Sequence, residues 1–271
     1  MTTATSVSAS ASIALDITPP LQYVLRLADT CLVHAQRLAE WCGHAPILEE
    51  DIALTNLSLD LVGQARGLLS HAGAALAGDA RFDEDQLAFL RDERDYFNLA
   101  LVELPGRKSG RDFADQVLRN FLLAAWLREL WAGLASSTDA EIAAIAGKSL
   151  KEVRYHVEHG SEWVVRLGDG TDESARRLRR ALDLLAPYLP EMFVDDAVDE
   201  AAAASGLGPR RSALKAGWLA TVRPVLADAG LALPADGKFL STSTTGVHTE
   251  HMGYLLAEMQ TLQRSFPGGA W

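Results

Sequence analysis

Seven consecutive residues near the middle of the chain, 121–127 (FLLAAWL), carry no polar side chain. The flanking residues have helical spacing, and seven residues make about two turns of an α-helix, so every face of the helix is apolar over this stretch. A helix that is apolar all round is buried all round. We therefore predict a helix over 112–135 at the centre of a helical bundle.

The rest of the chain also shows helical periodicity, and no segment shows the alternation typical of a β-strand. The spacing predicts further helices over 21–41, 49–76, 84–104, 138–167, 171–187, 191–204, 212–229 and 249–264. The longest would measure about 33–42 Å, which is typical of a ferritin-like bundle and too long for globin-like packing. The predicted fold class is all-α: a ferritin-like helical bundle with additional C-terminal helices.

Residues 1–19 are rich in Ala, Ser and Thr and contain no Lys or Arg. They lack the features of a signal peptide, so we predict a disordered tail followed by a single domain over 20–271. The formal net charge of −11 argues against binding to nucleic acid or to an anionic membrane. No apolar run approaches about 18 residues, so no transmembrane helix is predicted. Cys31 and Cys42 would lie about 16 Å apart on one helix, too far for a disulfide, which favours a reduced, cytoplasmic protein.

Long helices that carry carboxylates and histidines raise the question of a di-iron site. Such a site takes a Glu from each of two helices and a Glu-x-x-His motif from each of two others, because residues i and i+3 share a helix face. No Glu-x-x-His occurs on the helix predicted over 49–76, where Asp60 and Gln64 are the candidates. Glu152 and His156 are the candidates on the helix predicted over 138–167. The central helix has no acidic residue over 117–127.

Two interpretations of these residues remain open. An autonomous di-iron oxygenase would use Glu40, Asp60, Glu129, Glu152 and His156. The structural alternative, which the neighbouring cations favour, is a buried ion-pair network of Asp60, Gln64, Arg66, Glu152, Arg154 and His156. Buried charges persist in proteins when they are paired and hydrogen bonded.

Two other segments are weaker candidates for contact with a ligand or a partner. A basic face consists of Arg176, Arg177, Arg179 and Arg180. A solvated helix surface is the ordinary interpretation, and a phosphate-bearing ligand such as coenzyme A is the alternative. His248 and His251 stand three residues apart at the start of a predicted helix, but two imidazoles alone make a weak metal site.

Eight short stretches together resemble the C-subunit family of the phenylacetyl-CoA epoxidase complex. They are 38–44 (LAEWCGH), 48–54 (LEEDIAL), 60–66 (DLVGQAR), 90–94 (LRDER), 151–156 (KEVRYH), 166–171 (RLGDGT), 248–253 (HTEHMG) and 258–260 (EMQ). The resemblance covers about 21–271. It implies a ferritin-like fold and a place in an NADPH-dependent monooxygenase complex that epoxidises the ring of phenylacetyl-CoA in aerobic phenylacetate catabolism.

The same resemblance implies the partners of the chain. In that complex the di-iron centre belongs to the related A subunit, and the C subunit pairs with it as a structural partner. A small B subunit joins the assembly, and a reductase subunit with flavin and iron–sulfur groups supplies electrons from NADPH. The resemblance therefore implies no cofactor and no catalytic residue in this chain.

At two glutamate positions, the metal-binding motifs of the A subunit fall here on residues that cannot bind iron. Its Asp-Glu-Ala-Gly-His motif is similar to 60–64, where Leu61 replaces the glutamate and Gln64 the histidine. Its Lys-Glu-Glu-Ser-Phe-His motif is similar to 151–156, where Val153 replaces the second glutamate and only His156 keeps its type. Leucine and valine have no donor atom for iron. The resemblance thus implies a degenerate metal site and a structural role.

Overall fold

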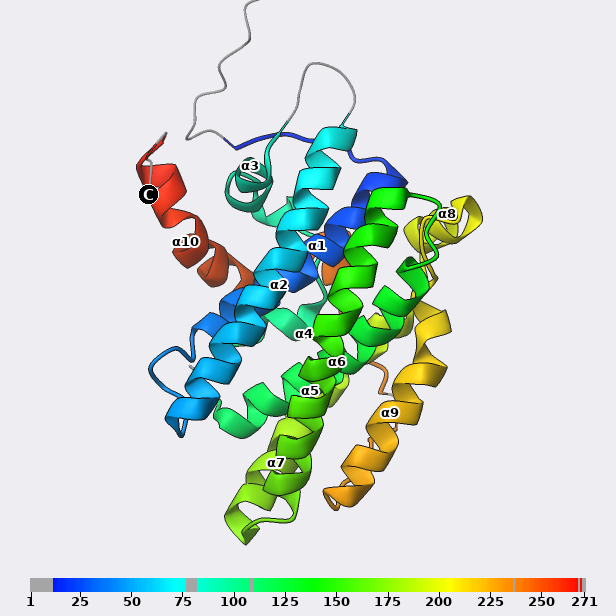
Figure 1. Cartoon of the computed structure of the whole chain (residues 1–271). Helices are drawn as coiled ribbons and strands as arrows, with labels where there is room; N and C mark the ends of the chain where they lie inside the picture. The colour runs from blue at the N-terminus through cyan, green and yellow to red at the C-terminus, as the bar shows by residue number, and fades with distance from the viewer. Residues whose placement is uncertain (1–11, 77–81, 108–109, 236, 268, 270–271) are drawn as a thin grey trace, which may run out of the picture.

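The computed structural model describes residues 12–76, 82–107, 110–235, 237–267 and 269. Four long helices form its bundle: α1 (Pro19–Ala39), α2 (Leu48–Ala75), α5 (Phe113–Leu134) and α6 (Ala140–Gly168). Helix α1 packs along α2, α5 packs along α6, and α2 contacts α6 (Figure 1). Short turns join the members of each pair, and one long crossover joins the pairs, as in ferritin-like bundles. The predicted fold class is confirmed.

Helix α5 is the central helix, as its apolar sequence predicts. Every residue from Phe121 to Leu127 is at most 3% exposed. Helices α6, α7 (Asp172–Leu185) and α9 (Lys215–Asp228) pack around it. Asp112 caps its N-terminus, since the carboxylate accepts a hydrogen bond from the Ala114 amide at 3.0 Å.

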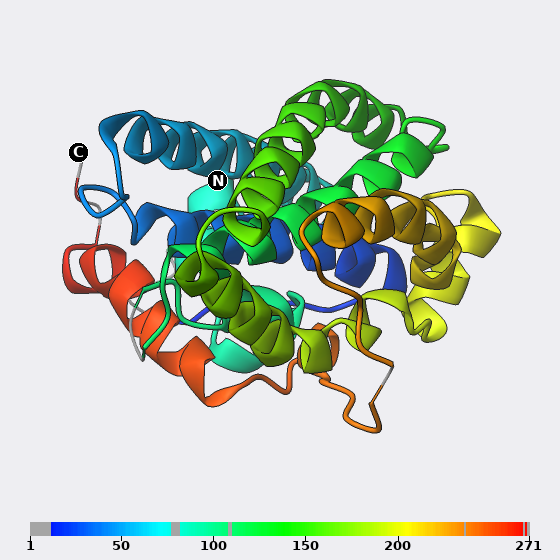
Figure 2. The same cartoon turned by 90° about the horizontal axis from the view of Figure 1, so that it is seen from below.

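Two smaller helices cover opposite edges of the bundle. Helix α8 (Ala197–Ser205) packs on α1, and α10 (Glu250–Ser265) packs against α3 (Glu84–Phe89) and α4 (Ala100–Glu103). Figure 2 shows α10 in red at one edge and α8 in yellow at the other. Short 3-10 helices occupy Glu93–Asp95, Ala186–Tyr188, Pro190–Phe193, Arg211–Leu214 and Ser243–Thr245. No helix in the described ranges is long and apolar enough to cross a membrane.

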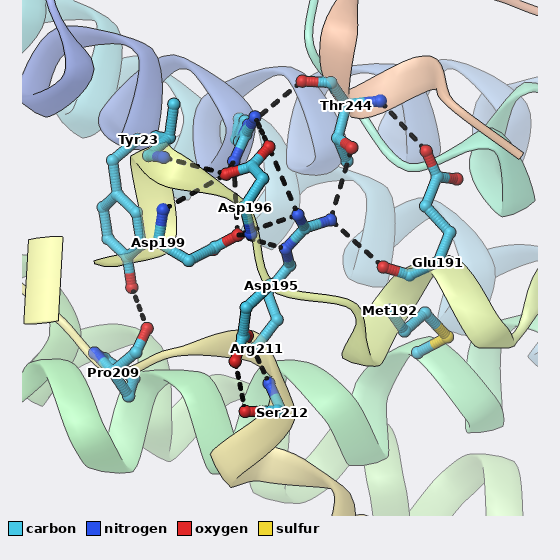
Figure 3. Close-up of polar contacts among 12 residues, drawn as sticks. Tyr23, Glu191, Met192, Asp195, Asp196, Asp199, Pro209, Arg211, Ser212 and Thr244 are labelled. Atoms are coloured by element: carbon cyan, nitrogen blue, oxygen red, sulfur yellow. Dashed lines mark hydrogen bonds and ion pairs between the residues drawn. The ribbon is translucent and has the colours of Figure 1, made fainter. Parts of the chain in front are cut away.

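A buried ion-pair cluster ties α1 to the C-terminal segments (Figure 3). Arg211 contacts a carboxylate oxygen of Asp199 at 2.8 Å and the hydroxyl of Thr244 at 3.3 Å. Arg26 of α1 donates to the carbonyl oxygen of Thr244 at 3.0 Å. Glu191 accepts from the amide of Thr244 at 3.0 Å. These contacts hold the short turns that contain Glu191, Arg211 and Thr244 against α1.

Three expectations from the sequence are wrong. The helix over 84–104 is broken, because α3 ends at Phe89 and the chain then runs irregularly to α4. The helix over 191–204 is a 3-10 turn followed by α8. The disordered tail does not extend to residue 19, since Ile13 is 4% exposed and its amide donates to the Leu90 carbonyl at 2.9 Å. Residues 1–11 of that tail lie outside the described residues.

Candidate functional site: the polar centre of the bundle

Each of the four long helices places a buried polar side chain inside the bundle. They are His34 on α1, Gln64 on α2, Asn120 on α5 and His156 on α6, each at most 2% exposed. The surrounding side chains are apolar, so these four residues and their partners form the polar centre of the bundle. Buried polar groups are normally hydrogen bonded, and their partners define the site.

Hydrogen bonds connect the polar centre across all four helices. His34 Nε2 lies 3.2 Å from Asn120 Oδ1, which joins α1 to α5. Gln64 Nε2 donates to Glu152 Oε2 at 3.0 Å, and His156 Nε2 lies 3.0 Å from Asp60 Oδ2, so two contacts join α2 to α6. The network therefore bridges both helix pairs.

Burial keeps the histidines of this centre uncharged at neutral pH. Burial, reinforced by the charge of Arg119, lowers the pKa of His34 to about 3. Burial also lowers the pKa of His156, although the hydrogen bond to Asp60 opposes the shift. Burial raises the pKa of the Cys31 thiol, whose Sγ lies 3.7 Å from Gln64 Oε1. The two histidines are therefore neutral partners in the centre, beside the carboxylates of Asp60 and Glu152.

The donor set does not fit a di-iron centre. Leu61 and Val153 are fully buried one turn before Gln64 and His156, where a Glu-x-x-His motif would need carboxylates. Amide and aliphatic groups cannot replace the bridging carboxylates of such a centre. Within the described ranges, no group of three or more His, Cys, Asp or Glu residues is arranged to hold a metal ion.

Part of the predicted ion-pair network is wrong. Asp60, Gln64, Glu152 and His156 do meet in the polar centre. Arg66 instead points outward and pairs with Glu84 at 3.1 Å, and Arg154 is exposed. The two arginines lie on the outer faces of α2 and α6, so they cannot reach the interior.

The ligand set of the autonomous oxygenase does not converge either. Glu40 pairs with Arg37 and accepts from the Gly106 amide at 3.1 Å. Glu129 pairs with Arg128 at 2.7 Å. Both carboxylates have partners outside the polar centre.

The two weaker candidate segments have structural partners. Arg176 and Arg177 are exposed and bond to Glu173 at 2.7 and 2.6 Å. His248 is buried, with Nδ1 2.7 Å from Glu103 Oε1 and Nε2 3.0 Å from the Tyr96 carbonyl oxygen. Burial opposes the charged form, but the hydrogen bond and charge of Glu103 outweigh it and raise the pKa of His248. His248 is therefore a buried ion-pair residue.

His251 is different from His248, since it is half-exposed. It lies in the first turn of α10 and lines a pocket together with Arg37 and Tyr254. Its imidazole Nε2 is 3.9 Å from Glu250 Oε1. This separation gives a weak, solvent-exposed pair.

Sequence reasoning missed three residues of the polar centre: Cys31, His34 and Asn120. A signal for two of them was present, because Cys31 and His34 stand three residues apart and so share a face of α1. Asn120 directly precedes the apolar stretch of α5. A polar residue at the edge of a fully buried helix requires a partner, and His34 is that partner.

Comparison with known proteins agrees with this structure. The family model described as phenylacetic acid catabolic protein matches residues 5–271. The C subunit of the 1,2-phenylacetyl-CoA epoxidase of Escherichia coli (strain K12) is 46% identical over 249 residues, covering 92% of this chain and 98% of that protein. The chain therefore belongs to the phenylacetic acid catabolic protein family.

Proposed function

We propose that this chain is the non-catalytic structural subunit of a multicomponent 1,2-phenylacetyl-CoA epoxidase in aerobic phenylacetate catabolism. It binds and stabilises the di-iron A subunit in the cytoplasm. The small B subunit and the NADPH-dependent reductase complete the assembly, and the iron, flavin and iron–sulfur groups belong to these partners. The similarity to the C subunit of an epoxidase supports this assignment.

The composition of the polar centre carries the proposal. A ferritin-like oxygenase needs carboxylates from all four helices around its metals. Here Leu61 and Val153 fill two of the positions, and the carboxylates of Glu152 and Asp60 are hydrogen-bond partners of Gln64 and His156. The centre thus holds the bundle together by hydrogen bonds and leaves oxygen chemistry to another subunit.

An exposed apolar surface on α2 supports partner binding. Leu48, Ile52 and Leu59 are 73%, 54% and 62% exposed, and their spacing puts them on one face of the helix. We call them the α2 stripe. Contiguous exposed apolar residues commonly mark protein interaction sites, and permanent interfaces between subunits are rich in them. We infer that the α2 stripe is covered by the A subunit.

Co-expression with the A subunit tests the proposal. We expect the two chains to co-purify through an affinity tag on either one. We also expect phenylacetyl-CoA oxidation, measured with B subunit and reductase present, to require both. Full oxygenase activity of the A subunit without this chain would contradict the structural role.

Metal content tests the degenerate site separately. After anaerobic reconstitution with ferrous iron, plasma emission should find iron in the complex but no stoichiometric iron in this chain alone. About two iron atoms bound per isolated chain, the stoichiometry of a di-iron protein, would contradict the proposal.

A further inference from the structure

A large cavity lies away from the polar centre, between α9 and the turns that follow α7. Its volume is about 820 Å³, within the range of small-molecule sites. Figure 2 shows the loop after α9 running beside those turns, and residues 231–235 of this loop form one wall. None of its lining residues belongs to the hydrogen-bond network of the polar centre. The proposed structural role does not use this cavity.

The inner wall of the cavity is aromatic and aliphatic. Trp218 and Phe193 line it with ring centroids 5.0 Å apart, and Leu219 and Leu233 extend the wall. The indole Nε1 of Trp218 donates to the Leu122 carbonyl oxygen at 2.9 Å. Because this polar group is already bonded to α5, Trp218 offers the cavity only apolar surface. An apolar or aromatic group is the natural occupant.

The mouth of the cavity is positively charged. Of the charged residues that the structure describes at this cavity, three are basic (Arg223, Lys215 and Lys238) and one is acidic (Asp183). Arg223 and Lys238 are exposed and have no hydrogen-bond or ion-pair partner among the residues that the structure describes. The arginines of α7 differ, since Arg176 is paired with an acid. In a chain of net charge −11, a cationic rim on an apolar cavity favours an anionic ligand.

We propose that this cavity binds an amphipathic organic anion. Its aromatic or acyl part packs on Trp218 and Phe193, and its acid group bonds to Arg223 and Lys238. A free aromatic carboxylate and an acyl thioester of a phosphorylated carrier share this chemistry. Guanidinium and ammonium groups bind carboxylate and phosphate alike, so the experiment must separate the two sources.

Binding to the full chain is measured with 8-anilinonaphthalene-1-sulfonate, an aromatic anion whose fluorescence rises in apolar sites. We expect saturable binding of one probe molecule. Competition then uses phenylacetate, phenylacetyl-CoA, coenzyme A and inorganic phosphate. Displacement by phenylacetate identifies a free acid, and displacement by phenylacetyl-CoA alone identifies a thioester. Displacement by phosphate alone would overturn the proposal, because it would show that the apolar wall plays no part.

Two variants locate the bound probe. The double variant Arg223→Glu with Lys238→Glu should weaken binding at least about tenfold, because it removes charged hydrogen bonds from the rim. Ala227→Trp should also weaken it, because Ala227 is exposed and lines the cavity, so the indole fills the space without disturbing the core. Calorimetry gives the affinities, and circular dichroism verifies that both variants are folded.

The matched control is Arg176→Glu with Arg177→Glu, which reverses two exposed charges on α7 outside the cavity. Its affinity should equal that of the unmodified chain. Absence of saturable binding, unchanged affinity in both cavity variants, or loss of binding in the control would each overturn the proposal. Failure here leaves the proposed structural role intact, since co-purification tests that role alone.

Discussion

At the scale of single residues, His34 is a buried imidazole that stays uncharged inside the bundle. Its pKa of about 3 keeps the imidazole neutral, so it can share a hydrogen bond with Asn120 at 3.2 Å. Protonation would place a charge beside the cationic Arg119 and far from water. The folded state therefore resists protonation of His34, whereas the unfolded chain does not.

Stability should fall as the pH is lowered through this difference. The unfolded imidazole takes up a proton near pH 6.5, whereas the folded one stays neutral until about pH 3. The contribution of neutral His34 to the free energy of unfolding is fully present above about pH 6.5 and is lost as the pH falls below this value. At pH 5 the loss from this residue is about 2 kcal/mol. His34→Gln should remove that part of the pH dependence, as measured by urea unfolding at pH 7 and pH 5.

His44→Gln is the matched control, because His44 is exposed on the turn between α1 and α2. This variant should retain the full loss of stability between pH 7 and pH 5. An equal loss in the His34 variant and the unmodified chain would contradict the prediction.

Helical spacing predicts some interior residues and not others. It predicts Asp60, Gln64, Glu152 and His156 as partners, because the first two share a face of α2 and the last two share a face of α6. It misses His34 because the partner Asn120 lies 86 residues away, and periodicity carries no information on which helices meet. The prediction for Arg66 fails because this residue lies on the outer face of α2, where it is exposed.

The crossover between the two helix pairs shows the same limit at the scale of elements. The amides of Phe97 and Leu99 donate to side chains on α1 at 2.9 and 3.2 Å. The amide of Ala100 donates to the carboxylate of Glu191 at 2.9 Å. These bonds replace the helical hydrogen bonds of the expected helix over 84–104. Their partners are 68 to 91 residues away, beyond the reach of any local pattern.

Glu103 should hold α10 in place. Its carboxylate accepts from Asn98 Nδ2 at 2.9 Å, from His248 Nδ1 at 2.7 Å and from the Thr249 amide at 2.7 Å. Glu103→Gln puts an amide donor against these donors and removes the charge that balances His248. We expect a loss of about 3–5 kcal/mol in unfolding free energy and faster hydrogen exchange throughout α10.

Glu250→Gln is the control for that change, because Glu250 belongs to α10 itself but its side chain is 85% exposed. It should leave both the unfolding free energy and the exchange of α10 nearly unchanged. Equal exchange rates in the two variants would show that Glu103 does not anchor this helix.

The α2 stripe should be the element that contacts the A subunit, given the proposed function. Leu48→Asp with Ile52→Asp places two charges on an apolar interface and should weaken capture of the A subunit at least about tenfold. The unfolding free energy should stay unchanged because both side chains are exposed. Leu184→Asp with Val194→Asp, also exposed but outside α2, is the control and should bind normally.

At the scale of the whole molecule, the fold follows from features that the sequence displays directly. The fully apolar stretch of α5 and the length of the helices predict a bundle, and the bundle is found. The interface with a partner is not predictable in this way. An apolar residue on the outer face of a helix, such as Leu59, reads as part of the core pattern until the bundle shows which face is exposed.

The response of the complex to salt should distinguish its binding forces at this scale. The chain carries a net charge of −11, so a complex based on charge would loosen at high ionic strength. The α2 stripe is apolar, and burial of apolar surface is not weakened by salt. We expect the affinity for the A subunit, measured by calorimetry, to change by less than about threefold between 0.1 M and 1 M sodium chloride, where the screening length falls from about 10 to 3 Å. A loss of a hundredfold or more would place the contact on charged surfaces instead, because only charge pairs respond so steeply to screening.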